Sequence, residues 1–288
     1  MSRTSSVVGR YIYLDVDGQE YRVYYEEAGS GIPVLMQHTA GADGRQWRHQ
    51  LEDPELTRDF RLIAYDLPFH GKSLPPTDSR WWEEEYRLTQ DFFTKFIVAM
   101  SHALELDNPV YLGCSVGGTL APVLALHYPD EFRAVIGCES TAKMPGFFVD
   151  YWDHPRISNE GKGAMMLGIQ SPKVPEVNTR ENDYLFRQCE LRVLKGDLYY
   201  YSIEHDLTET AGDIDTSRIP VYILNGEWDL ATPAAEGRAI AEKIPGAKFT
   251  ELKGLGHFPM NEDPELFKSY LVPVLEEIKA KASVGSLR

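Results

Sequence analysis

Cysteine is scarce in this chain of 288 residues, which contains only Cys114, Cys138 and Cys189. Three cysteines cannot build the paired framework of a disulfide-stabilised module, and their spacing matches no zinc motif. The sequence therefore predicts no metal site and a reducing compartment, the cytoplasm.

Long hydrophobic runs are also missing. No stretch of about 18 apolar residues is available to cross a bilayer, and residues 1–6 lack the apolar core of a secretory signal. Both absences predict a soluble protein without a membrane partner.

Positive charge is in short supply, because 29 Lys and Arg face 44 Asp and Glu, giving a formal charge of −15. Such a chain repels phosphate backbones unless a basic patch intervenes, and the sequence shows none. We expect a small-molecule substrate and no nucleic acid. The sequence leaves the oligomeric state open, a homo-oligomer included.

The glycine patterns of nucleotide-binding proteins are incomplete. Gly71-Lys72-Ser73 resembles the end of a phosphate-binding loop, but the position that requires the first glycine of that motif holds Asp66. The Gly-x-Gly sequences starting at Gly29 and Gly254 lack the third glycine of a dinucleotide-binding loop. No cofactor is therefore expected.

What is present is the composition of a folded protein, with 43% hydrophobic and 25% charged residues. Short β-rich segments alternate with helical patterns, which predicts an α/β fold with a mainly parallel, eight-stranded sheet flanked by helices. The predicted strands are 11–14, 21–25, 33–37, 61–65, 110–113, 133–137, 221–224 and 248–252. The predicted helices are 89–106, 116–127, 233–244 and 264–281, the last with Asp263 as its N-cap.

One long segment, residues 142–217, interrupts this alternation. It contains no clear strand and is rich in aromatic and sulfur-containing side chains, such as Trp152, Met165 and the run Tyr199-Tyr200-Tyr201. We therefore predict a helical insertion at 142–217 within a core made of residues 1–141 and 218–288.

The sequence Gly113-Cys114-Ser115-Val116-Gly117 is a Gly-x-Ser-x-Gly motif. A predicted strand precedes it and a predicted helix follows, and in that setting a sharp turn exposes a nucleophilic serine hydroxyl. The glycines leave room for the turn. Amides at the helix start, above all that of Val116, point toward developing negative charge. The motif predicts Ser115 as a nucleophile.

A serine hydroxyl needs a base and an orienting acid, and both follow in the sequence. Asp229 comes shortly after the predicted strand 221–224, and His257 follows 248–252 within a Gly-Leu-Gly-His sequence. Loops at the carboxyl ends of strands are where open α/β sheets place their sites. We predict a catalytic triad of Ser115, Asp229 and His257.

With these features the chain resembles the α/β-hydrolase superfamily over nearly its whole length. The resemblance implies a serine hydrolase with a helical cap, here 142–217, inserted after the sixth strand of the core. Residues 37–41 (Gln-His-Thr-Ala-Gly) look like the family's oxyanion loop, although Thr39 stands where a glycine is usual. The resemblance implies that the amides of Ala40 and Val116 stabilise the oxyanion.

Two further positions depend on the resemblance. Residues 66–73 look like the family's Asp-x-x-Gly-His-Gly-x-Ser turn, in which Phe69 replaces a glycine and His70 is expected to be structural. Some relatives, the zearalenone-lactone hydrolases among them, take the triad acid from the end of the sixth strand, where this chain has Glu139. The Gly-x-x-Asp pattern favours Asp229, with Glu139 as the alternative.

The sequence thus predicts a serine hydrolase that cleaves an ester, lactone or amide of a small to medium hydrophobic substrate through an acyl-enzyme. Carbon–carbon bond hydrolysis or lyase chemistry on the same triad, and a slow-turnover ligand sensor of the same fold, are the alternatives. An aspartate nucleophile would be needed for dehalogenase or epoxide hydrolase chemistry, which Ser115 therefore disfavours. The expected substrate-binding residues are Phe69, Trp152, Met165 and Phe258.

Overall fold

The computed structural model describes residues 4–76 and 78–285. An eight-stranded sheet with the order β1-β2-β4-β3-β5-β6-β7-β8 forms its centre. The strands are β1 (Val8–Val16), β2 (Gln19–Gly29), β3 (Ile32–Gln37), β4 (Phe60–Tyr65), β5 (Val110–Cys114), β6 (Ala134–Cys138), β7 (Val221–Gly226) and β8 (Lys248–Leu252). The β1–β2 and β2–β4 pairs are antiparallel and all the others parallel, which confirms the predicted α/β class.

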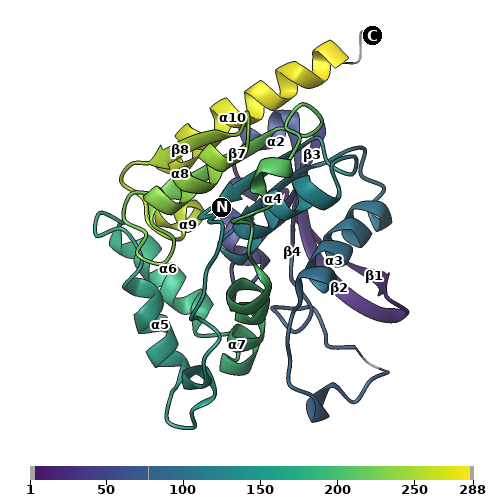
Figure 1. The fold of residues 1–288 in the computed structure, drawn as a ribbon. Coiled ribbons are helices and arrows are strands. Elements are labelled where there is room, and N and C mark those ends of the chain that lie inside the picture. The colour runs from purple at the N-terminus through teal and green to yellow at the C-terminus, as the bar shows by residue number, and fades with distance from the viewer. Residues whose placement is uncertain (1–3, 77, 286–288) are drawn as a thin grey trace.

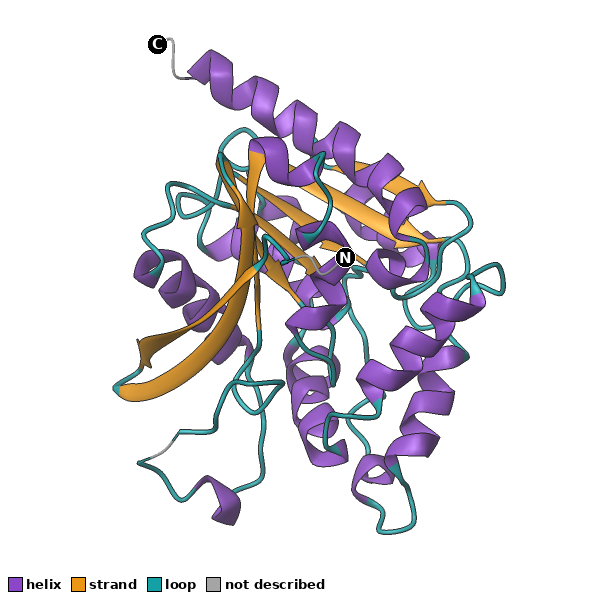
Figure 2. Ribbon diagram, turned by 180° about the vertical axis from the view of Figure 1, so that it is seen from behind, coloured by secondary structure: helices purple, strands orange, loops and turns teal. Residues whose placement is uncertain are grey.

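Helices cover both faces of the sheet (Figure 2), and the central strands are buried on both faces. Their residues alternate between two cores: Leu35 and Tyr111 belong to one, whereas Val34 and Leu112 belong to the other. Successive side chains of a strand point to opposite faces, so a continuous apolar run is needed where both faces are covered.

One face is covered by α3 (Gln90–Ala103), α4 (Val116–His127) and α8 (Ala234–Lys243), whose buried side chains include Phe96, Leu120 and Ile240. The other face is covered by α10 (Pro264–Gly285) with the short helices α1 (Arg48–Leu51), α2 (Leu56–Asp59) and α9 (Pro259–Glu262). The predicted cap of α10 is confirmed, because the amide of Leu266 donates to Asp263 Oδ1 at 3.0 Å.

Between β6 and β7 the chain forms α5 (Asn159–Leu167), α6 (Glu176–Phe186) and α7 (Leu191–Tyr199). A π-helical turn, Tyr200–Glu204, follows α7 directly. Figure 1 shows these helices grouped at the end of the molecule opposite α10. Shorter 3₁₀ turns lie at Gly44–Trp47, Trp81–Glu83, Asp150–Asp153 and Ala211–Asp213.

A membrane-spanning helix would need a long apolar stretch. Within residues 4–76 and 78–285, none of the helices combines the length and hydropathy required to cross a bilayer.

Candidate active site

Ser115 lies in a sharp turn between the last residue of β5, Cys114, and the first residue of α4, Val116. Its φ of 57° is in the left-handed region, which is unusual for a non-glycine residue and is found where function requires it. The turn is possible because a side chain is absent beside it. A Cβ at Gly118 would lie 1.8 Å from the carbonyl oxygen of Cys138, so only glycine fits there.

The three residues of the predicted triad lie in a hydrogen-bonded row. The Ser115 hydroxyl is 2.9 Å from His257 Nε2, and His257 Nδ1 is 2.7 Å from Asp229 Oδ2. All three side chains are buried, which keeps water from competing for these hydrogen bonds. This geometry lets Ser115 pass its proton to His257 while Asp229 fixes the imidazole tautomer.

Asp229 is held as a carboxylate. Its Oδ1 accepts the amide of Ala231 at 2.7 Å, and Oδ2 also accepts the Thr232 hydroxyl. Burial works to raise the pKa of Asp229. The attraction of His257 and the hydrogen bonds from His257, Glu139 and Thr232 outweigh burial and lower the pKa to about 2. A charged Asp229 can therefore stabilise the imidazolium that forms when His257 takes a proton.

Glu139 is fully buried beside Asp229, in a left-handed backbone conformation with a φ of 53°. The amide of Gly226 donates to both of its carboxyl oxygens, at 2.9 and 3.0 Å. Burial, the charge of Asp229 and a hydrogen bond to Asp229 raise the pKa of Glu139 well above its ordinary range. A neutral Glu139 is thus positioned as a donor to Asp229, while His257 is hydrogen-bonded to Asp229.

The loop that carries His257 is fastened by a residue that the sequence did not single out. Glu262 accepts the amides of Gly256 at 2.7 Å and Phe258 at 2.9 Å, and it also accepts the amide of Ser171 at 3.1 Å. The loop is therefore fixed on both sides of His257. A carboxylate four or five positions after a histidine is too common a pattern to have revealed this role.

The predicted oxyanion loop after β3 has one amide without a partner among the described residues. The Thr39 amide donates to Gln46 Oε1 at 2.9 Å, the Gly41 amide donates to Asp197 Oδ2 at 2.8 Å, and the Ala40 amide between them has no acceptor among the described residues. Thr39 also uses its hydroxyl to bind Gln46, at 3.1 Å, which accounts for a side chain where glycine is usual. Val116 is the first residue of α4, where helix amides have no partner within the helix.

A buried carboxylate on α7, Asp197, ties the insertion to this loop. Besides the Gly41 amide it contacts His70 Nε2 at 2.9 Å, and the Tyr86 hydroxyl donates to its Oδ1 at 2.9 Å. Burial lowers the pKa of His70, but the charge and hydrogen bond of Asp197 raise it by more. The position of the oxyanion loop thus depends on α7.

A cavity of about 110 Å³ opens at Ser115 and His257. Of the predicted substrate-binding residues, Trp152, Met165 and Phe258 line it. The lining also includes Thr39, Ala40, Phe147, Met166, Ile169, Leu194, Leu198, Tyr201 and Ala231. A wall of this composition suits an apolar group next to the reacting carbonyl.

Phe69 requires a correction, because it does not line that cavity. The turn holds Phe69 with a φ of 71°, and its ring packs on Tyr86 at 4.5 Å and on Trp81 at 5.7 Å between centroids. The half-buried ring lines a different cavity, together with Trp81 and Tyr86.

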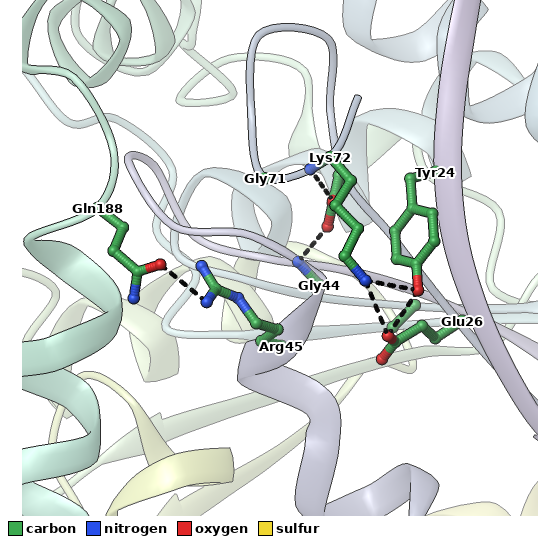
Figure 3. A pocket seen from close by; sticks show the side chains of 9 residues that line it. Tyr24, Glu26, Gly44, Arg45, Gly71, Lys72 and Gln188 are labelled. Atoms are coloured by element: carbon green, nitrogen blue, oxygen red, sulfur yellow. Dashed lines mark hydrogen bonds and ion pairs between the residues drawn. The ribbon is translucent and has the colours of Figure 1, made fainter. Parts of the chain in front are cut away.

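A second cavity, of about 260 Å³, is drawn in Figure 3. On one side Lys72 donates to the Tyr24 hydroxyl at 2.9 Å, and Tyr24 donates to Glu26 at 2.8 Å. On the other, Arg45 donates to Gln188 at 3.0 Å. Because these groups satisfy one another, the cavity gives no indication of a ligand. In the described part of the chain, no cluster of three or more His, Cys, Asp and Glu side chains could hold a metal.

We expect two buried histidines to work against the fold on mild acidification. Burial lowers the pKa of His38 and of His205 to about 4, from 6.5. Between these values the unfolded chain binds protons that the folded chain does not bind, so each histidine lowers stability as the pH drops from 6.5 to 4. The raised pKa values of Asp66, to about 6, and of Glu139 act in the opposite direction over part of this range. The loss is about 3 kcal/mol for each histidine. Urea unfolding at several pH values measures it.

Relative to the parent protein, the variant His205→Gln should lose about 3 kcal/mol less stability between pH 6.5 and 4. His154→Gln is the matched control, since His154 is exposed, and it should leave the slope unchanged. The raised pKa of His70 acts above pH 6.5 and in the opposite direction, adding stability as the pH falls. The same change in unfolding free energy from pH 6.5 to 4 in His205→Gln as in the parent protein would contradict the assignment.

Comparison with known proteins agrees with the fold. A family model described as the α/β-hydrolase fold matches residues 32–159. The chain is 22% identical over 264 residues to karrikin insensitive 2 receptor IA of Petunia hybrida, covering 86% of this chain and 90% of that protein. It is 23% identical over 295 residues to a 2-hydroxy-6-oxononadienedioate/2-hydroxy-6-oxononatrienedioate hydrolase of Burkholderia vietnamiensis, covering 94% and 97%.

Among solved structures, a thermophilic esterase from Thermogutta terrifontis matches with a TM-score of 0.80 at 21% identity, covering 93% of this chain and 99% of the esterase. Its likeness concerns the fold. Together with the matched family model and the strand order, it leads to one conclusion: this chain has the α/β-hydrolase fold.

Proposed function

We propose that this protein is a serine hydrolase that cleaves a carboxylic ester, lactone or amide of a small to medium hydrophobic substrate. The observation that carries the proposal is the row of hydrogen bonds from Ser115 through His257 to Asp229, which opens into an apolar cavity. The esterase of matching fold supports the same reaction class.

In the proposed mechanism, Ser115 Oγ attacks the substrate carbonyl carbon while its proton passes to His257 Nε2. The carbonyl oxygen becomes an oxyanion that accepts hydrogen bonds from the amides of Ala40 and Val116. His257 returns the proton to the leaving alcohol or amine as the carbon–heteroatom bond breaks. Water, deprotonated by His257, then hydrolyses the acyl-enzyme and releases the acid.

We propose that residues 142–217 act as a cap that shapes the substrate pocket. The insertion supplies the apolar wall of the cavity opposite Ser115, with Trp152, Met165, Leu194 and Leu198 among its side chains. A volume of about 110 Å³ favours a short acyl or alkoxy group. An apolar cavity of about 150 Å³ accommodates benzene, which sets the scale.

Two relatives each support an alternative function. The Burkholderia protein is named a hydrolase of 2-hydroxy-6-oxo dienedioates, which keeps carbon–carbon bond hydrolysis on the same triad as the alternative reaction. The Petunia protein is named a receptor, which keeps slow-turnover ligand sensing as the alternative role.

Turnover of a panel of compounds tests the proposal. The panel comprises p-nitrophenyl esters of two to eight acyl carbons, a γ-lactone, an anilide and a 1,3-diketone. We expect hydrolysis of the esters with the highest kcat/KM at two to four carbons. Cleavage of the diketone alone would establish the carbon–carbon alternative. Ligand-induced stabilisation without any turnover would establish the sensor.

A further inference from the structure

The hydroxyl of Tyr201 is a buried polar group without a partner. The side chain is 2% exposed, yet its oxygen makes no hydrogen bond with any of the described residues. Buried hydroxyls nearly always have a partner, so an unsatisfied one in a folded protein requires an explanation.

The residues on either side of Tyr201 are, in contrast, fully engaged. The Tyr200 hydroxyl lies 3.1 Å from His205 Nδ1, and Ser202 Oγ accepts the amides of Phe147 and Phe148 at 2.9 and 3.0 Å. These bonds fix the π-helical turn Tyr200–Glu204, a type of turn frequent at functional sites. Tyr201 is thus held in place by its neighbours, while its own hydroxyl is buried and has no partner among the described residues.

The Tyr201 side chain lines the cavity that also contains Ser115 and His257. Burial raises the pKa of Tyr201 well above its ordinary value, and interaction with the Ser115 side chain opposes that rise. Tyr201 and Ser115 thus line the same cavity. Apart from Ser115, Thr39 and His257, the cavity is otherwise lined by apolar side chains, so Tyr201 is a rare hydrogen-bond donor within it.

The candidate hydrogen-bond donors come from different parts of the fold. The Ala40 and Val116 amides come from the loop after β3 and from the start of α4, and in the proposed mechanism they hold the reacting carbonyl oxygen. Tyr201 comes from the insertion between β6 and β7. A donor that reaches Ser115 from another part of the fold is available for a second oxygen.

We propose that the Tyr201 hydroxyl donates a hydrogen bond to a second acceptor oxygen of the substrate, and so selects oxygen-bearing acyl or alkoxy groups over hydrocarbon groups of the same shape. The inference rests on the proposed function and narrows its substrate class to esters and lactones with an ether, keto or hydroxyl oxygen near the scissile bond. A hydrocarbon would leave the hydroxyl buried and unpaired, an unfavourable arrangement that an oxygen acceptor removes.

Two isosteric substrate pairs test the selection from either side of the scissile bond. One compares p-nitrophenyl methoxyacetate with p-nitrophenyl butyrate, and the other compares 2-methoxyethyl acetate with butyl acetate. In Tyr201→Phe we expect the kcat/KM ratio of the oxygen-bearing ester to its hydrocarbon partner to fall about tenfold in at least one pair. Because the variant's ratio is compared with that of the parent protein, differences in the intrinsic reactivity of the esters cancel.

The control is Tyr200→Phe, which removes a hydroxyl that is already bonded to His205 and does not line the cavity. It should lower the melting temperature and leave both ratios unchanged. Tyr201→Phe removes an unpartnered hydroxyl and should melt no lower than the parent protein. Unchanged ratios in Tyr201→Phe, or an equal fall for both esters of each pair, would overturn the proposal.

A binding measurement separates this inference from the proposed function. In the Ser115→Ala variant, dissociation constants of methoxyacetanilide and butyranilide are measured without turnover. We expect the methoxy compound to bind about tenfold tighter, and the difference to vanish when Tyr201→Phe is added. Equal binding in Ser115→Ala together with unchanged ester ratios refutes the role of Tyr201. If the parent protein hydrolyses no ester but Ser115→Ala still binds the methoxy compound more tightly, only the proposed hydrolase function is refuted.

Discussion

Replacing Ser115 by alanine is expected to reduce ester hydrolysis by roughly 10⁶-fold, to the level left by binding and oxyanion stabilisation. The Ser115 hydroxyl is 2.9 Å from His257 Nε2, so its loss removes the proposed nucleophile. The same variant should lose covalent labelling by a fluorophosphonate probe. Initial rates with p-nitrophenyl acetate and labelling detected by mass spectrometry measure the two effects.

Ser140→Ala is the matched control for this experiment. Ser140 is also a fully buried serine, it follows the neighbouring strand β6, and its hydroxyl has no hydrogen-bond partner among the described residues. The control should retain turnover and labelling. Undiminished labelling of Ser115→Ala at the parent rate would show that another residue is the nucleophile.

Replacing Asp229 by asparagine should lower kcat by about 10⁴-fold, since an amide facing His257 Nδ1 favours the wrong imidazole tautomer and cannot stabilise the imidazolium. Asp229 is the acid in direct contact with His257, at 2.7 Å. Folding should persist, because asparagine has the same shape. Steady-state kinetics at pH 8, with circular dichroism as a check of the fold, measure the effect.

The neighbouring acid provides the comparison that decides between the two candidates. Glu139→Gln should cost less than about tenfold, because glutamine keeps an acceptor for the Gly226 amide and a donor toward Asp229, as the protonated acid does. If Glu139→Gln proved as damaging as Asp229→Asn, with both variants folded, Glu139 would share the role of the triad acid.

The sequence pattern located the parallel strands better than the antiparallel pair β1–β2. β8 runs from Lys248 to Leu252 as predicted, and α4 has the predicted bounds Val116–His127. The predicted strand 11–14 is in reality Val8–Val16, because pairing with β2 continues through residues that do not follow the apolar pattern, such as the exposed Gly9, Arg10 and Asp15. Backbone hydrogen bonds extend an antiparallel pair whatever the side chains, so hydrophobicity understates its length.

The candidate site was predictable where it depends on the local chain. The turn at Ser115 needs glycines at fixed offsets, and the strand-to-helix context identifies it without any knowledge of distant residues. Asp229 and His257 follow from their places after strands. The position of Phe69, by contrast, was wrong, since the packing of its ring on Tyr86 and Trp81 is a tertiary contact.

The sequence by itself determined the fold class and the order of the three reacting residues, because strand periodicity and turn glycines act over a few residues. Only the tertiary structure decided how the two acids divide their roles, since the pKa values of Asp229 and Glu139 depend on burial and on each other. It also decided which of three consecutive tyrosines faces the reacting serine. The π-helical turn after α7 orients Tyr201 toward the cavity, and no local pattern encodes that choice.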